Sequence, residues 1–162
     1  MTSPSGPERT WDLRVILEET KVKDIMTKDV VSVRVDASFS EVPKKMKEYS
    51  IRHLPVVDSK NKLVGMITQR MLYRIQVPRK LLDGELYYDE SALRDIILKH
   101  VMVPNPYTMK PEDNMGKLLL KMVYGRYGSV PIVDDDNTLC GLVTRHSVLK
   151  VVADIYAQRD RS

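Results

Sequence analysis

The sequence predicts a layered α+β fold in which one β-α-β-β-α unit occurs twice. Two observations lead to this prediction: a stretch of about fifty residues recurs along the chain, and its apolar positions change between strand and helix periods in the same order each time. A unit of that size is close to the lower limit for independent folding. We therefore expect the two units to pack their sheets together with pseudo-two-fold symmetry as one domain.

The repeat is clearest around two polar turns that are flanked by apolar runs. Residues 52–68 read RHLPVVDSKNKLVGMIT, and residues 128–144 read GSVPIVDDDNTLCGLVT. At a constant offset of 76 residues, the segment 22–73 aligns with 98–149 without a gap, and 11 of the 52 aligned residues are identical. Seven of these identities fall within the two quoted stretches, so the second half of the unit is the more constrained half.

The first unit begins with an apolar lead and an extended run of β-branched residues, which predicts a strand. The Ser38-x-x-Glu41 pattern is a capping box and predicts the start of a helix. Two apolar runs separated by a polar turn predict a hairpin, and Thr68 marks the change from strand to helix. The expected elements are the lead 22–26, a strand at 30–33, the helix from Ser38, strands at 54–57 and 63–67, and a helix after Thr68.

The second unit repeats this order. An asparagine stands where its first helix should begin, and asparagine is among the most favourable N-cap residues. The expected elements are a strand at 107–109, a helix capped by Asn114, strands at 130–133 and 139–143, and a closing helix over about 145–157.

The repeat boundaries divide the chain into an N-terminal lead 1–21, the first unit 22–75, a connector 76–97, the second unit 98–157 and a C-terminal tail 158–162. The opening MTSPSGPERTW predicts a flexible segment. The connector contains a predicted helix near 91–100 with an apolar stripe, which we expect to pack against the second unit. An interaction surface around residues 86–88 is the alternative for this region. The stripe consists of Leu93, Ile96, Ile97 and Val101.

Composition and charge bound the class of protein. Hydrophobic residues make up 43% of the chain and charged residues 30%, as in ordinary soluble globular proteins. No apolar run reaches the ~18 residues of a membrane span, and the opening segment lacks the apolar core of a signal peptide. The single cysteine, Cys140, excludes an internal disulfide and fits a reducing cytoplasm. The net charge of +4 mildly favours anionic partners, including nucleotides, although its basic residues are spread along the chain.

The doubled order of these motifs resembles the CBS-domain pair, also called the Bateman module. The motifs read DIMTKDVVSV, HLPVVD and LVGMIT in the first unit, and HVMVPNPYTM, SVPIVD and LCGLVT in the second. The resemblance covers residues 22–153. It implies two packed CBS repeats with two clefts between them, which in family members often hold AMP, ADP, ATP or S-adenosylmethionine. It also implies a regulatory module that forms a homodimer and, with no further domain expected in this chain, acts on a separate partner protein.

The resemblance implies that each cleft combines the strand-to-helix turn of one repeat with the lead and first hairpin strand of the other. The turn takes the ribose and phosphate, and the lead and strand take the base. The favoured cleft consists of Thr27, Val31, Ile51, Arg52, His53, Thr144, Arg145, His146 and Ser147. The second cleft consists of Thr68, Arg70, Met71, Val103, Tyr107, Tyr127, Gly128 and Ser129.

Residue types favour the first of these clefts. Family members that bind a ribose usually carry an aspartate three residues after the turn threonine, and this chain has Met71 and Ser147 there instead. Ser147 keeps a hydroxyl, whereas Met71 is a poor hydrogen-bond acceptor. Arg145 and His146 also place more positive charge beside a helix N-terminus than the Gln-Arg pair of the other turn. The alternative for these cations is a solvated helix face.

Two further features of the turns have both a structural and a ligand-binding interpretation. Each turn threonine either caps its helix or, with the free N–H groups there, meets a phosphate. Gly65 and Gly141 let a neighbouring backbone segment or a ligand approach the strand closely.

Patterns for catalysis and metal binding are absent from the sequence. His53, His100 and His146 have no metal-ligand spacing among themselves or with Cys140. There is no Ser-His-Asp order, no pair of catalytic carboxylates and no glycine-rich phosphate loop. The run Asp134–Asp136 aligns with the polar turn of the first unit and predicts a hairpin loop. We therefore expect a protein that is not an enzyme and holds no metal.

A homodimer is predicted from the helices as well as from the resemblance, because they carry more apolar surface than two small sheets need. The residues behind this prediction are Phe39, Val42, Met46, Leu118, Leu119 and Met122.

Three functions remain open from the sequence. The leading hypothesis is a cytoplasmic regulatory module that senses a small anionic ligand, above all an adenine nucleotide, and signals to a partner protein. The second is a structural interaction protein whose clefts are closed by Met71, Tyr107 and Tyr127. The third, motivated by the positive charge, is a nucleic-acid-binding module.

Overall fold

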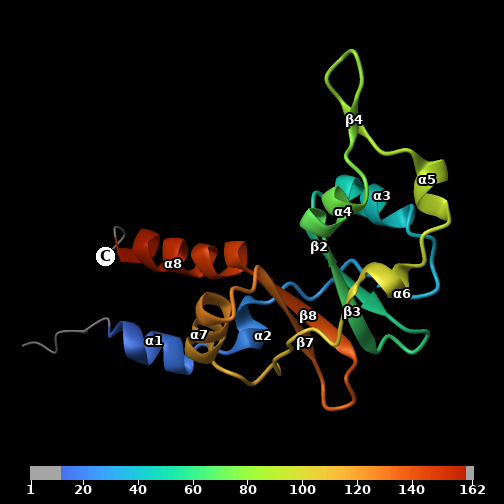
Figure 1. Cartoon of the computed structure of the whole chain (residues 1–162). Helices are drawn as coiled ribbons and strands as arrows, with labels where there is room; N and C mark the ends of the chain where they lie inside the picture. The colour runs from blue at the N-terminus through green and yellow to red at the C-terminus, as the bar shows by residue number, and fades with distance from the viewer. Residues whose placement is uncertain (1–11, 160–162) are drawn as a thin grey trace, which may run out of the picture.

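Each of the two units folds around a β-hairpin, and the residue pairing is equivalent in the two hairpins (Figure 1). The first hairpin pairs β2 (His53–Val57) with β3 (Leu63–Thr68), and the second pairs β7 (Ser129–Val133) with β8 (Leu139–Thr144). In both hairpins the register shifts at the last residue of the first strand. Each of the four strands extends one residue beyond its apolar run, so the predicted hairpins are confirmed.

The computed structural model describes residues 12–159. The predicted flexible segment at residues 1–11 lies outside the described residues, and so do residues 160–162. The closing helix, α8, runs from Arg145 to Arg159 and therefore includes the first two residues of the predicted tail.

The same neighbours flank both hairpins. Strand β2 pairs in parallel with β1 (Val33–Arg34), and β3 pairs antiparallel with β6 (Val103–Pro104), which gives the sheet order β1-β2-β3-β6. Single bridges occupy the matching places in the second unit, where Met109 joins β7 and Thr27 joins β8. The lead of each unit therefore lies on the hairpin of the other unit, as pseudo-two-fold symmetry requires.

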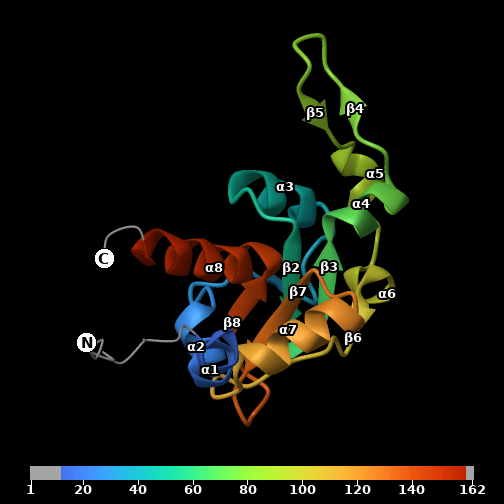
Figure 2. The same ribbon diagram turned by 90° about the vertical axis from the view of Figure 1, so that its left-hand side faces the viewer.

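Short helices cover the sheets, and a small hairpin projects from the connector (Figures 1 and 2). The predicted cap of the second-unit helix is confirmed, because the Asn114 side chain accepts a hydrogen bond from the Lys117 N–H at 2.8 Å. The remaining elements are α1 (Leu13–Glu19), α2 (Val22–Ile25), α3 (Glu41–Glu48), α4 (Gln69–Ile75), β4 (Arg79–Lys80), β5 (Leu86–Tyr87), α5 (Glu90–Arg94), α6 (Leu98–Val101) and α7 (Met115–Tyr124).

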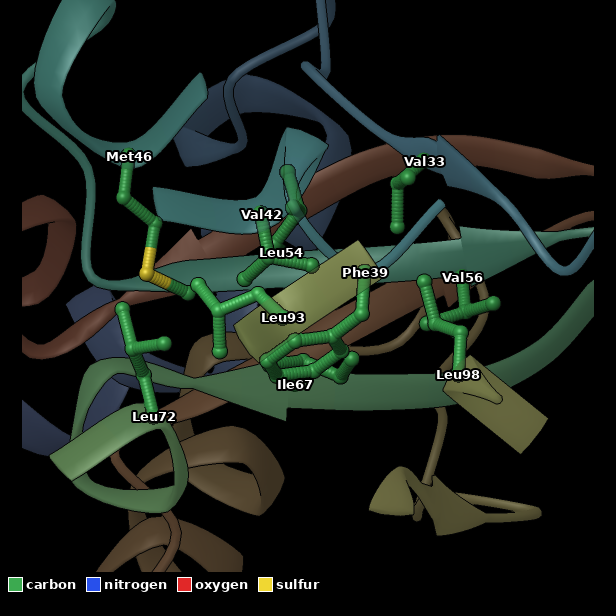
Figure 3. Close-up of a cluster of buried hydrophobic side chains, with 10 residues drawn as sticks. All are labelled: Val33, Phe39, Val42, Met46, Leu54, Val56, Ile67, Leu72, Leu93 and Leu98. Atoms are coloured by element: carbon green, nitrogen blue, oxygen red, sulfur yellow. The ribbon is translucent and has the colours of Figure 1, made fainter. Parts of the chain in front are cut away.

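Each of the two main cores is completed by a segment from elsewhere in the chain. In the first core, Leu93 of α5 and Leu98 of α6 join the side chains of the first unit (Figure 3). In the second core, Val22 of α2 packs among residues that follow it by about ninety positions or more. The first core comprises Val33, Phe39, Val42, Met46, Leu54, Val56, Ile67, Leu72, Leu93 and Leu98. The second comprises Val22, Met109, Met115, Leu118, Met122, Val130, Ile132, Val143 and Val148.

The connector departs from its prediction in two ways. The helix expected near 91–100 is divided into α5 and α6, because Ile97 forms a backbone bridge with Ser38 between them and is itself 58% exposed. The apolar residues of the connector pack against the first unit and not, as expected, against the second. Leu93, Ile96 and Val101 of the predicted stripe pack against a core and Ile97 does not, and periodicity alone does not say which core a helix covers.

Three other local predictions are wrong. Only Val33 of the expected strand 30–33 belongs to β1, and Met109 is the one residue of 107–109 that pairs with a strand. The helix α3 begins at Glu41 without a side-chain cap, because the Ser38 hydroxyl bonds to that of Ser40 at 2.9 Å instead of closing a capping box.

The apolar helix residues that motivated a dimer are mostly core residues. Phe39, Val42, Met46, Leu118 and Met122 are buried, and Leu119 packs against the second core. The large apolar side chains that these helices expose are different ones. On α7 and α8 they are Leu120, Val123, Tyr124, Leu149, Val152 and Tyr156, each more than half exposed.

The helices α3 and α4 and the connector residues 85–88 line an open pocket of about 530 Å³. Two ion pairs connect α3 to the connector, Lys44 with Glu90 at 2.9 Å and Lys47 with Glu85. The pocket is lined by, among others, Pro43, Met46, Gln69, Tyr73, Tyr87 and Tyr88. The surface suggested around residues 86–88 is therefore part of a hollow on the first unit.

Candidate functional site

The two strand-to-helix turns have closely similar hydrogen bonds. At the end of β3, the Thr68 hydroxyl oxygen accepts from the Met71 N–H at 3.3 Å, and at the end of β8 the Thr144 oxygen accepts from the Ser147 N–H at 3.3 Å. Each threonine therefore caps its helix, which is the structural alternative predicted for it. The Thr144 turn has one more polar group, because the Ser147 hydroxyl also accepts from the Thr144 N–H at 3.2 Å.

The leads approach these turns from the opposite repeat. Thr27 and Leu142 exchange two backbone hydrogen bonds of 2.9 and 3.0 Å, which brings the first lead to β8 two residues before the Thr144 turn. In the same way Val103 lies opposite Met66 on β3. Thr27 therefore belongs with the Thr144 turn and Val103 with the Thr68 turn, as in the predicted grouping.

Gly65 and Gly141 allow the leads to lie this close. A Cβ atom placed on Gly141 would stand 2.3 Å from the Met26 Sδ, and one placed on Gly65 would stand 2.3 Å from the Met102 Sδ. The group that approaches each strand is thus a methionine of the other repeat's lead. Met26 and Met102 are themselves an identical pair in the repeat alignment, so the sequence held a signal for this contact.

The first hairpin strands begin beside the turns of their own repeats. The Arg52 carbonyl accepts from the Gln69 N–H at 2.8 Å, and the Gly128 carbonyl accepts from the Arg145 N–H at 3.3 Å. The sequence prediction grouped Arg52 and His53 with the Thr144 turn, and Gly128 and Ser129 with the Thr68 turn. The hydrogen bonds join each strand start to the turn of its own repeat, and His53 also lies close to Gly128 and Arg145 of the second repeat.

His53 connects the two groups of residues. A Cβ atom on Gly128 would lie 2.8 Å from the His53 Nε2, so the imidazole fits against a position that has no side chain. Burial lowers the pKa of His53, and the charges of Arg145 and then Arg52 lower it further. The imidazole of His53, in the first repeat, is thus close enough to Arg145 of the second repeat for the arginine charge to lower its pKa.

The cations of the favoured cleft are available to an anion. Arg52, Arg145 and His146 are exposed. Among residues 12–159, the ion pairs of the structure involve none of these three side chains. Arg70, on the other turn, is exposed in the same way. The favoured cleft therefore carries more positive groups near its helix N-terminus.

Aromatic residues mark the second cleft. The rings of Tyr107 and Tyr127 stack with centroids 5.3 Å apart and planes 7° from parallel, and the Lys121 Nζ lies 5.4 Å from the Tyr107 centroid. Sequence reasoning missed Lys121, although its identity with Lys45 in the repeat alignment could have drawn attention to it. The matching wall residues of the favoured cleft, Val31 and Ile51, are half-buried and pack against the first core.

No group of three or more His, Cys, Asp or Glu side chains within residues 12–159 is arranged to hold a metal ion. In the same range no helix is both long enough and apolar enough to cross a membrane.

Comparison with known proteins agrees with this geometry. The family model of the CBS domain matches residues 22–77 and 98–154. The chain therefore belongs to the CBS-domain family, and it carries two copies of the domain in tandem. The predicted α+β fold of two packed CBS repeats is confirmed.

Relatives of known function share this region. Inosine-5′-monophosphate dehydrogenase of Methanocaldococcus jannaschii is 33% identical over 142 residues, which cover 87% of this chain and 25% of that protein. Homoserine O-acetyltransferase of Methanohalobium evestigatum is 28% identical over 142 residues, covering 88% and 26% respectively. The chain thus spans about a quarter of the length of these two relatives.

A solved structure gives the likeness in three dimensions. A CBS domain pair in complex with 5′-methylthioadenosine and S-adenosyl-L-methionine is 26% identical, with a TM-score of 0.66. The match covers 82% of this chain and 99% of that one.

Proposed function

We propose that this CBS pair is a regulatory module that binds an adenine nucleotide in the cleft at the Thr144 turn. Binding of the nucleotide then changes the behaviour of a partner protein. One observation carries the proposal: the CBS pair solved with two adenosine-containing ligands matches nearly its whole length to this chain. The hydrogen-bonding turns and the exposed cations support the same conclusion. Inosine-5′-monophosphate dehydrogenase supports the idea of an enzyme as the partner, because that relative carries the matching region within an enzyme chain.

The favoured cleft has the groups that a phosphate needs. The N-terminus of α8 brings the positive end of a 15-residue helix to this turn. Arg145 stands at its first position and adds a guanidinium, which binds phosphate oxygens through paired hydrogen bonds. Ser147 supplies a hydroxyl for the ribose where family members usually have a carboxylate. Met71 supplies no such group on the other side.

The charge of the cleft ranks the candidate ligands. AMP, ADP and ATP bring increasing negative charge, whereas S-adenosylmethionine carries a sulfonium cation. We expect affinity to rise with phosphate count because each added phosphate meets the guanidinium groups of Arg52 and Arg145. S-adenosylmethionine is then the weakest of the four ligands.

Calorimetric titration of the four ligands tests this function, with melting temperatures as a second readout because a ligand of the native state raises them. A charge-assisted hydrogen bond contributes roughly 1.5–3 kcal/mol, so Arg145→Ala should weaken nucleotide binding about tenfold to a hundredfold. Arg70→Ala is the matched control and should change binding little. Equal losses from the two substitutions would refute the choice of cleft, and no binding of any nucleotide would refute the function.

We also propose that the active species is a homodimer formed through the exposed faces of α7 and α8. Six large apolar side chains on these helices are more than half exposed, and burying them would favour association. If no nucleotide binds and the dimer persists, the structural interaction protein becomes the better description.

A further inference from the structure

Tyr107 and Tyr127 form a stacked aromatic pair on the second repeat. Their centroid distance of 5.3 Å and interplanar angle of 7° place the two rings in direct stacking contact. Lys121, on α7, lies at cation–π distance from Tyr107. Gly125 at the end of α7 leaves room for Tyr127, because a Cβ atom there would stand 2.3 Å from its Cε2. Both rings are thus held against the same helix.

The pair stands on the segments that wall the second cleft. Tyr127 precedes Gly128, which contacts the His53 ring, and His53 is the register partner of Thr68. Tyr107 belongs to the lead that begins with β6, and β6 pairs with β3, the strand that ends at Thr68. The two rings therefore lie where the lead and the strand start of the second repeat meet.

The first repeat has no equivalent of this pair. Val31 and Ile51 occupy the positions aligned with Tyr107 and Tyr127. Both are aliphatic, and both pack against the first core. The two clefts therefore differ most in the part that would contact a flat base.

A base cannot enter between two rings that already touch. Intercalation requires about 7 Å between the rings, which is twice the van der Waals separation of carbon atoms. The rings are nearly parallel with centroids 5.3 Å apart, so the spacing between their planes is at most about that distance. We infer that the Tyr107–Tyr127 pair itself occupies the base position of the second cleft, so that one chain binds one adenine nucleotide and not two. This inference rests on the proposed function and fixes its stoichiometry.

Titration calorimetry with ATP counts the sites. We expect one ATP per wild-type chain, and also one for Tyr107→Phe/Tyr127→Phe, which keeps both rings. We expect two for Tyr107→Val/Tyr127→Ile, which gives the second cleft the aliphatic side chains of the first, with weaker affinity at the second site because Met71 supplies no hydroxyl for the ribose. The reverse exchange, Val31→Tyr/Ile51→Tyr, should weaken ATP binding at least tenfold. Tyr87→Ala removes an exposed tyrosine of β5, outside both clefts, and is the control with one site. Melting temperatures verify that each variant is folded.

The outcomes separate this inference from the function on which it rests. Two ATP molecules per wild-type chain would overturn the inference and leave the nucleotide function intact. A single site in folded Tyr107→Val/Tyr127→Ile would also overturn it, because the tyrosines would then not be what excludes the base. If ATP binds Tyr107→Val/Tyr127→Ile but not the wild type, that result would support the exclusion of the base by the two tyrosines. If ATP binds neither, the proposed function fails and the inference with it.

Discussion

Asn61 and Asn137 occupy equivalent positions in the two repeats, and each donates a side-chain hydrogen bond to the other repeat. The Asn137 amide reaches the Leu63 carbonyl at 2.9 Å, and the Asn61 amide reaches the Leu139 carbonyl at 3.2 Å. Both residues have a positive φ, of 62° and 60°, which asparagine tolerates better than most residues. The asparagines therefore shape the hairpin turns and join the two repeats at the same point.

Replacing Asn137 should separate these two contributions. Asn137→Ala loses the hydrogen bond and strains the turn, so we expect a loss of about 1–3 kcal/mol in the free energy of unfolding. Asn137→Gly relieves the strain and should lose about 1 kcal/mol or less. Urea denaturation measures both. Asn105→Ala is the control, because Asn105 has a φ of 45° but makes no such bond; equal losses in the three variants would contradict the role of the bond.

The contact between Gly141 and Met26 predicts a second effect on stability. Gly141→Ala would force the Met26 side chain aside, at an expected cost of about 1–3 kcal/mol. Replacing Met26 with alanine in the same chain should recover part of that loss, which a double-mutant cycle by urea denaturation measures.

Gly116→Ala is the matched control for this cycle. Its added Cβ would lie 3.5 Å from the nearest atoms, which is ordinary contact, and it stands inside α7. We expect this substitution to stabilise the protein by up to about 1 kcal/mol, because alanine favours helix more than glycine does. A similar loss at Gly116 and Gly141 would show that the clash with Met26 is not the cause.

His53 predicts a dependence of stability on pH. Its pKa is lower in the folded chain than the ordinary 6.5, so the unfolded chain takes up a proton first as the pH falls. Stability should therefore be unaffected by His53 above about pH 7, should decrease through pH 6.5, and should reach its full loss below the folded pKa.

Thermal melts of wild type and His53→Gln between pH 5 and 8 check this dependence. The variant should lose less stability on acidification than the wild type. His100→Gln, at an exposed position of α6, is the control and should behave as the wild type. If the melting temperatures of wild type and His53→Gln fall equally with decreasing pH, His53 is not the cause of the pH dependence.

The exposed face of α7 and α8 predicts a dimer that single charges disrupt. Leu149→Glu and Tyr156→Glu should each shift light-scattering mass from twice 18.6 kDa toward 18.6 kDa at tens of micromolar, because a buried unpaired charge is costly. Leu82→Glu, on the projecting hairpin, should leave the mass unchanged. A wild-type mass of one chain would reject the dimer itself.

Most of the fold was predictable from the sequence because the same pattern of strands, turns and helices occurs in both repeats. The hairpins, the Asn114 cap and the start of the closing helix follow from local patterns that both copies share. Such patterns do not predict which core each short helix packs against. Leu93 and Leu98 lie on pieces of helix too short for their period to specify a partner, and only the folded chain shows that they cover the first core.

The candidate site was predictable to a similar degree. Residue types located the two turns and their threonines, and the family resemblance supplied the crossing of the leads. The closeness of His53 to Gly128 and Arg145 was not predictable, because it depends on how the strand starts of two repeats meet in space. The stacking of Tyr107 on Tyr127 depends on the same long-range packing.

The exchange of covering segments between the two cores has a consequence for how the chain is made and divided. A nascent chain that has passed the first hairpin still lacks Leu93 and Leu98, while Val22 has no core to enter until the second hairpin is synthesised. The first core can therefore close only after Leu98 has been synthesised, and the second only after its own hairpin has followed. A gene split within the connector would give two products that each carry a cover belonging to the other. Such products are expected to be soluble only when they are produced together.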